Sequence, residues 1–225
     1  MTIRSAAVIV AAGSGRRLGA SVPKAFVRLN GRPMLEYSLT AFQACPQVNC
    51  IVLVVPPGHR FKGLTYFDRF PKLAAIVTGG RERPDSVRAG LAAVPPGNNI
   101  CLIHDAARPL VSMGQISSVA VAAGRYGAAI LAAPVTDTIK RVRRRSITGT
   151  IDRSGLWKAQ TPQGFKLDII GRTHFGDKAF YTTDDSQLAE RLNIRVRLVP
   201  GDDRNIKITS PVDMEMASCL LKKKA

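Results

Sequence analysis

The sequence predicts an α/β protein built on a mostly parallel sheet that has helices on both faces. Short apolar runs with the length of buried strands occupy residues 6–12, 51–55, 74–77, 100–104 and 128–133. Segments with helical periodicity lie between several of these runs, so strands and helices alternate along the chain. This alternation is typical of a parallel sheet whose crossover helices cover both faces.

Residues that favour helix ends support the intervening helices. Helices are expected over residues 34–44 and 86–93, and from Ser112 to about Tyr126. Pro33 stands at the start of the first helix, where its fixed φ is favourable. Asp85 and Ser112 are the expected caps of the other two, because their side-chain oxygens can accept from free backbone N–H groups.

The pattern changes after Pro134. Residues 138–142 and 156–160 are short, polar and broken by turn residues, which predicts a β-arm over 136–160 that leaves the main sheet. A basic turn, 143–145, is expected near its tip. An arm without its own core needs a surface to pack on, so a homodimer is expected. An arm that folds back on its own domain is the alternative.

The carboxyl-terminal part continues the α/β pattern. Helices are expected over residues 167–174 and 185–192, followed by a strand over 195–199. Ser210 and Pro211 have the residue types of a cap and a first helical position, so a last helix begins there. No repeat or low-complexity linker appears, and one domain over residues 1–225 with an inserted arm is expected.

The chain is strongly basic, with 33 lysines and arginines against 16 acids and a formal net charge of +17. This charge fits either a protein with anionic substrates or a nucleic-acid-binding protein. The basic clusters at 141–145 and 222–224 contain no aromatic residues, and no nucleic-acid-binding motif is visible. Nucleic acid is therefore the less favoured partner.

Composition also bears on the compartment. No apolar stretch approaches the roughly 18 residues of a membrane span. The first apolar run leads into glycines and arginines rather than a signal-peptide cleavage site. The four cysteines form no CxxC pair and no zinc-finger spacing, so free thiols in a reducing compartment are expected. A cytoplasmic protein that binds no membrane is the expectation.

The first predicted strand runs into a glycine-rich loop over residues 11–19. Gly13 and Gly15 let the backbone approach a polyphosphate and direct N–H groups toward it. The loop is not a Walker A motif, and Leu18 replaces the third glycine of the dinucleotide fingerprint. Cations in or after the loop are Arg16, Arg17 and Lys24. A bound anion would offset their repulsion, although a plain turn with solvated cations is the alternative.

Two further loops follow predicted strands. Gly79 and Gly80 would admit a flat base, and Ser86 offers a hydroxyl at a helix start. Asp105 could hold a magnesium ion that keeps waters and phosphate ligands, and Arg108 could reach a phosphate. Helix capping and surface charge are the alternatives. Because the carboxyl ends of parallel strands meet, the three loops predict one crevice for an anionic ligand.

Seven segments occur in one order and span nearly the whole chain. They are AAGSGRRLG with PK, GGRERPDSV, HDAARP, APVTDTIK, DRSGLWKAQTPQ, TTDD and NIKIT. This set resembles the 2-C-methyl-D-erythritol 4-phosphate cytidylyltransferases of the non-mevalonate isoprenoid pathway. The resemblance implies a Rossmann-like nucleotidyltransferase fold with a protruding β-arm, and a homodimer with exchanged arms. It also implies CTP as a substrate and a divalent cation, normally Mg²⁺.

The resemblance carries site residues onto this sequence. The CTP-binding residues would be Ala11, Ala12, Gly13, Gly15, Gly80, Ser86, Asp105 and Ala106, with Asp105 also binding the metal. The catalytic residues would be Arg17, Lys24 and Lys207. The sugar-alcohol phosphate would be held by Arg108, Thr138, Arg153, Thr161 and Thr183. Arg153 would come from the partner subunit. Arg81 departs from the acidic residue that some relatives carry there, which leaves the base contact open.

The implied reaction is a cytidylyl transfer. An oxygen of the sugar phosphate would attack the α-phosphorus of CTP in line, and pyrophosphate would leave. No general base is needed, because a phosphate monoester is already a nucleophile at neutral pH. Two alternatives stay open: a cytidylyltransferase for another polyol phosphate, such as ribitol 5-phosphate, and a non-catalytic basic nucleic-acid-binding protein.

Overall fold

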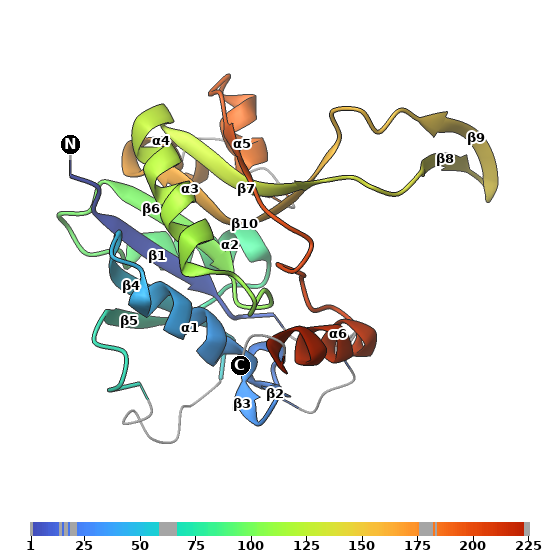
Figure 1. Ribbon diagram of the computed structural model, residues 1–225. Coiled ribbons are helices and arrows are strands. Elements are labelled where there is room, and N and C mark those ends of the chain that lie inside the picture. The colour runs from blue at the N-terminus through green and yellow to red at the C-terminus, as the bar shows by residue number, and fades with distance from the viewer. Residues whose placement is uncertain are drawn as a thin grey trace.

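The computed structural model describes residues 2–13, 15, 18, 22–58, 67–175, 182 and 184–222. Within them, the main sheet has the strand order β11-β7-β10-β6-β1-β4-β5 (Figure 1). Its strands are β1 (Ser5–Val10), β4 (Val48–Val55), β5 (Leu73–Thr78), β6 (Ile100–Asp105), β7 (Ala128–Pro134), β10 (Trp157–Lys166) and β11 (Arg197–Pro200). All run in one direction except β10, which is antiparallel to both of its neighbours, β6 and β7. The expected mostly parallel sheet is confirmed.

The central strands are buried on both faces, as their continuous apolar sequences predict. Successive side chains of β1 point to opposite faces, so Ile9 joins one apolar cluster and Val8 the other. The cluster around Ile9 includes side chains of α1 (Met34–Ala44) and α3 (Met113–Tyr126). The cluster around Val8 includes side chains of α2 (Arg83–Ala92) and α4 (Leu167–Phe175). Helices therefore cover both faces.

The caps expected at Ser112 and Asp85 had different outcomes. Ser112 caps α3, because its Oγ accepts from the backbone N–H of Gln115 at 3.2 Å. Helix α2 begins at Arg83, three residues earlier than expected, and its cap is Glu82. Asp85 was the wrong cap: its side chain instead accepts from the Glu82 N–H at 3.1 Å, as the other half of a capping box.

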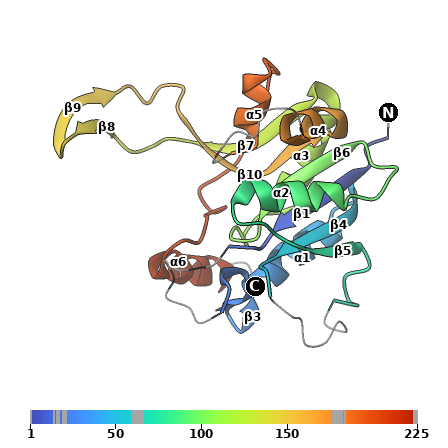
Figure 2. The same ribbon diagram turned by 180° about the vertical axis from the view of Figure 1, so that it is seen from behind.

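A two-stranded hairpin of β8 (Ile139–Arg143) and β9 (Ser146–Ile151) projects from the main sheet (Figures 1 and 2). Its tip is the basic turn expected there, with positive φ at Arg144 and Arg145. The predicted pairing was wrong, because the partner of β8 is β9 rather than residues 156–160. Residues 157–160 belong to β10, whose first residues pair with β7 in the main sheet. The first three residues of β10 are exposed, and buried residues begin at Gln160.

The carboxyl-terminal segment returns to the carboxyl ends of the strands. Helix α5 (Ser186–Arg191) leads to the edge strand β11, and α6 (Pro211–Lys222) ends the described chain. Side chains of α6 pack with β2 (Arg28–Leu29) and α1 in a third apolar cluster that includes Leu29, Met34 and Ala217. Ser210 caps α6 as expected, accepting from the Asp213 N–H at 3.3 Å. This packing brings residues 205–209 beside β6.

None of the helices in the described ranges is long and apolar enough to cross a membrane.

Candidate active site

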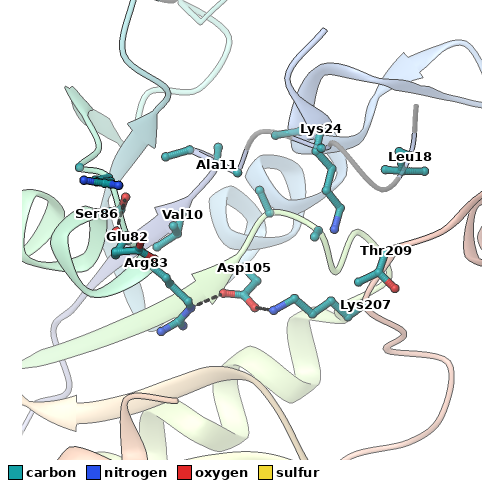
Figure 3. Close-up of a pocket in the computed structure, with 18 residues that line it drawn as sticks. Val10, Ala11, Leu18, Lys24, Glu82, Arg83, Ser86, Asp105, Lys207 and Thr209 are labelled. Atoms are coloured by element: carbon teal, nitrogen blue, oxygen red, sulfur yellow. Dashed lines mark hydrogen bonds and ion pairs between the residues drawn. The ribbon is translucent and has the colours of Figure 1, made fainter. Parts of the chain in front are cut away.

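A cavity of about 620 Å³ opens at the carboxyl ends of β1, β5 and β6. Its walls come from the loops that follow these strands, together with Lys24 and the segment 207–209 (Figure 3). Segments far apart in the sequence thus meet at one edge of the sheet. The single crevice predicted from the three loops is present.

The cavity gathers most of the residues that the resemblance implies for nucleotide binding and catalysis. Those lining it are Ala11, Ala12, Gly13, Gly15, Gly80, Ser86, Asp105, Ala106, Lys24 and Lys207. The third expected catalytic residue, Arg17, lies outside the described residues, as does Thr183. The described cavity therefore contains two lysines, one buried carboxylate and an approachable glycine loop.

Gly15 allows the first loop to fold closely over Lys24. Its φ is +71°, and a Cβ there would lie 2.9 Å from the Lys24 Cβ and 3.0 Å from the Lys24 backbone nitrogen. Any other residue would clash and adopt an unfavourable backbone conformation. Lys24 is the first residue of the short 3-10 helix η2 (Lys24–Phe26), whose next residue, Ala25, is buried. Lys24 consequently points into the cavity (Figure 3).

Gly80 similarly allows the second loop to pack on the start of α2. A Cβ at Gly80 would lie 2.2 Å from the Cβ of Asp85, so only glycine fits. Ser86, in the first turn of α2, is buried and donates from its hydroxyl to the Glu82 carbonyl at 3.2 Å. Arg81 lines the same wall and is exposed, so its guanidinium can reach a ligand there.

Asp105 is the electrostatic centre of the cavity. Its Oδ2 lies 2.6 Å from Lys207 Nζ, and its Oδ1 accepts from Arg83 Nε at 3.1 Å (Figure 3). Burial alone would raise the pKa of Asp105, but the charges of Arg83 and Lys207 outweigh burial and hold it below the usual range. Asp105 is therefore ionised at neutral pH, with a cation on each oxygen.

Sequence reasoning missed Arg83, which lines the cavity beside Asp105. It lies within the GGRERPDSV segment, between the paired glycines and Ser86, and this position is the only signal that could have drawn attention to it. Its second ion-pair partner, Asp185, comes from a distant part of the chain. Sequence spacing cannot reveal such a contact.

His104, which the sequence leaves open between core and site, belongs to the core. It is fully buried, with Nδ1 3.1 Å from the Thr161 hydroxyl and Nε2 3.3 Å from the Ser38 hydroxyl. Burial lowers the pKa of His104 to about 3, so the ring is neutral at physiological pH. The Thr161 hydroxyl also accepts from the Asp105 N–H at 3.1 Å. His104 thus supports the backbone beneath Asp105.

The residues expected to hold the sugar phosphate do not line this cavity within the described chain. Arg108 donates to the backbone carbonyls of Asn205 at 2.7 Å and Ala159 at 3.2 Å, so it joins β10 to the segment 205–209. Thr161 is buried under Asp105. Thr138 and Arg153 are exposed at the root of the hairpin, where Arg153 donates to the Thr136 carbonyl.

The donor set bears on the expected divalent cation. Within the described residues, no cluster of three or more His, Cys, Asp or Glu side chains could hold a metal by itself. Asp105 offers a carboxylate at the cavity wall. This arrangement fits Mg²⁺, which commonly takes one or two protein carboxylates and completes its shell with water and substrate phosphates.

The sequence matches the protein family described as IspD, 2-C-methyl-D-erythritol 4-phosphate cytidylyltransferase, over residues 5–223. A relative of that name from Pelotomaculum thermopropionicum is 44% identical over 223 residues, covering 96% of this chain and 94% of its own. One from Geobacillus thermodenitrificans is 43% identical over 219 residues, covering 96% of each.

The fold comparison agrees. The crystal structure of 2-C-methyl-D-erythritol 4-phosphate cytidylyltransferase from Thermus thermophilus superposes with a TM-score of 0.81 at 32% identity. The match covers 96% of this chain and 98% of that one. A crystal structure titled 4-diphosphocytidyl-2C-methyl-D-erythritol synthase gives a TM-score of 0.82, also at 32% identity, and covers 98% of this chain and 100% of its own. The chain belongs to the 2-C-methyl-D-erythritol 4-phosphate cytidylyltransferase family.

Proposed function

We propose that this protein transfers the cytidylyl group of CTP to 2-C-methyl-D-erythritol 4-phosphate and releases pyrophosphate. The observation that carries the proposal is the convergence of the glycine loop, Lys24, Lys207 and Asp105 on one cavity. Backbone N–H groups and lysines are suited to a triphosphate, and family membership supplies the identity of the two substrates.

The residues of the cavity suit a reaction that depends on positioning and charge. The attacking phosphate oxygen needs no base, and the neutral, buried His104 is not among the cavity-lining residues. Lys24 and Lys207 would neutralise the charge that gathers at the α-phosphate as the two phosphate groups approach each other. Holding both substrates in line lowers the barrier further by converting an encounter into a preorganised step.

Asp105 is the residue that would hold the divalent cation. When bound, Mg²⁺ supplies charge neutralisation and orients the phosphate oxygens of the nucleotide. Lys207 and Arg83 contact the same carboxylate, so they keep Asp105 ionised before a ligand binds. Lys207 is the more exposed of the two cations, and its four-carbon stem allows its ammonium to turn from Asp105 toward a phosphate.

We further propose a cytoplasmic homodimer that exchanges its β8–β9 arms. The arm has no core of its own, and its apolar Val142 and Ile147 are 57% and 66% exposed. Burying such side chains on a partner would stabilise both subunits. Arg153 lies at the root of the arm and does not line the cavity of its own chain, which supports delivery to a partner's site. The four free cysteines support a reducing compartment.

Pyrophosphate release tests the reaction directly. Purified protein is incubated with CTP and Mg²⁺ and either 2-C-methyl-D-erythritol 4-phosphate or ribitol 5-phosphate, with UTP and ATP as nucleotide controls. Release with methylerythritol phosphate and CTP alone is expected. Release only with ribitol phosphate would retain the chemistry but change the substrate. No release from folded protein would refute the transferase assignment and favour a binding protein.

A further inference from the structure

A buried ionic group lies behind the cavity wall, and the reaction described above assigns it no role. Asp185 precedes α5, and its side chain is 1% exposed. His174 is in the last turn of α4, and its fully buried side chain places Nε2 3.2 Å from Asp185 Oδ1. Charged groups this deeply buried are costly unless they are paired, so the partners of Asp185 indicate what the group does.

Arg83 connects this buried group to the cavity. Its Nη2 lies 2.8 Å from Asp185 Oδ2, while its Nε donates to Asp105 Oδ1 at 3.1 Å. Its remaining nitrogen, Nη1, is buried and has no hydrogen-bond partner among the described residues, and the contacts of Asp185 with Arg83 and His174 are ion pairs rather than aligned hydrogen bonds. The two carboxylates are thus what orients the guanidinium. A planar guanidinium can join two carboxylates in fixed directions, whereas a lysine ammonium is a single point charge.

The opposite charges in this series of contacts stabilise one another against the cost of burial. Burial would lower the pKa of Arg83, but the carboxylates of Asp185 and Asp105 outweigh burial and raise it. Burial would likewise raise the pKa of Asp185, but Arg83 and then His174 keep it below the usual range. Arg83 lies between the carboxylates of Asp105 and Asp185, so removing either partner leaves a charge in the interior with less compensation.

The two cations that contact Asp105 differ in how firmly they are held. The Lys207 side chain is 41% exposed, whereas that of Arg83 is 22% exposed and is anchored to a fully enclosed carboxylate. A solvated lysine can leave Asp105 when a ligand binds. Arg83 cannot leave without breaking its contact with Asp185.

We propose that Arg83 is a positioning residue that fixes the Asp105 carboxylate for the divalent cation, and that buried Asp185 and His174 hold Arg83 in place. The inference rests on the proposed role of Asp105 as the metal-binding residue. Outer partners that orient a metal ligand typically account for about 10- to 100-fold in metal affinity or activity. The series of contacts from His174 through Asp185 and Arg83 to Asp105 has this arrangement.

The test measures Mn²⁺ binding by electron paramagnetic resonance with a non-hydrolysable CTP analogue and no sugar phosphate. Three variants probe the chain of contacts: Asp185→Asn, Arg83→Lys and His174→Gln. The matched control is Arg88→Ala, which removes another arginine of α2 whose ion pair, with Asp85, does not involve Asp105. Circular dichroism and melting temperature identify which variants are folded, and kcat and KM are measured on those.

Asp185→Asn and Arg83→Lys should each weaken Mn²⁺ binding by about tenfold or more and lower kcat, with little change in KM for the sugar phosphate. His174→Gln should act in the same direction by a few-fold and is the mildest perturbation of the fold. Arg88→Ala should bind Mn²⁺ like the wild type. Arg83→Lys retains the positive charge, so its failure to rescue would show that the planar contact is required.

Wild-type Mn²⁺ affinity and kcat in the folded variants would overturn the proposal, even if their melting temperatures fall, because the group would then serve stability alone. An Asp105→Asn variant separates this failure from a failure of the metal assignment. If that variant binds Mn²⁺ as well as the wild type does, Asp105 is not the ligand, and both proposals fall.

Discussion

The cavity and the β8–β9 arm are both rich in cations, but the cations differ in whether they form ion pairs. In the cavity, Lys207 and Arg83 are paired with Asp105. The arm over residues 139–151 contains no acidic residue, and none of its five lysines and arginines forms an ion pair within the described chain: Lys140, Arg141, Arg143, Arg144 and Arg145. In the cavity, acidic side chains of the protein neutralise the cations and hold them in place. On the arm the charge is left to solvent or to a partner.

The largest expected difference between the two regions concerns single lysines. Lys24→Ala should lower kcat at least about a hundredfold, because it removes a preorganised cation from the reacting phosphates. Lys140→Ala on the arm removes a lysine that donates a hydrogen bond to the Thr150 hydroxyl, and it should leave kcat within about twofold of the wild-type value. Steady-state kinetics by pyrophosphate release provide the comparison. Near-normal turnover in Lys24→Ala would show that the cavity lysine is not catalytic.

Glycine substitutions sharpen the same comparison. Gly15→Ala should lower kcat/KM by about tenfold or more, because the added Cβ would displace Lys24 and strain the backbone. The arm provides the matched control: Gly149→Ala places its Cβ in open space and should leave kcat/KM unchanged. Equal activity of the two variants would indicate that the close approach of the first loop to Lys24 is dispensable.

Substitutions on the arm should instead affect dimer association. Ile147→Asp places a charge where an exposed apolar side chain is available to a partner, and the dimer dissociation constant should rise about tenfold. Analytical ultracentrifugation over a concentration series measures this change. The circular dichroism spectrum should stay that of the wild type, because Ile147 is outside the apolar core of the subunit. An unchanged dimer would place the interface elsewhere.

The smallest effect is expected at the tip of the arm. Replacing Arg143, Arg144 and Arg145 together with serine should leave kcat/KM within about twofold at physiological salt, since exposed charges contribute little at a distance. The same variant should bind generic DNA more weakly at low salt if the tip supplies part of the non-specific attraction. A large loss of turnover instead would mean that the tip reaches a site.

Local sequence patterns predicted individual strands and helix caps better than they predicted which distant segments pair. The buried strands and the cap at Ser112 follow from local composition and were confirmed. The position of β10 between β6 and β7 was missed, because its first residues are a mixture of polar and apolar types and its partner β6 lies far away in the sequence. The cap of α2 was misplaced because Glu82 and Asp85 both take part in one capping box.

The same distinction applies to the site. Motif residues after three strands predicted the cavity, because the parallel topology forces strand ends to meet. The contact of Arg83 with Asp185 could not be predicted, since it depends on how α4 packs against both α2 and α5. The substrate-binding role expected of Arg108 stays a prediction; its guanidinium donates to two backbone carbonyls, a contact that no residue pattern encodes.

The continuity of the arm with β10 limits where the chain can be shortened. The carbonyl of Ala159 accepts from Arg108, and the side chain of Gln160 donates to the Asp202 carbonyl at 2.9 Å and accepts from Asn205. A deletion confined to residues 139–151 removes the projection and leaves these contacts whole. A deletion that extends to residue 160 also removes the anchor of the segment that carries Lys207. Shortening the arm at its tip should therefore leave the cavity intact, whereas cutting into its root should loosen the segment that carries Lys207.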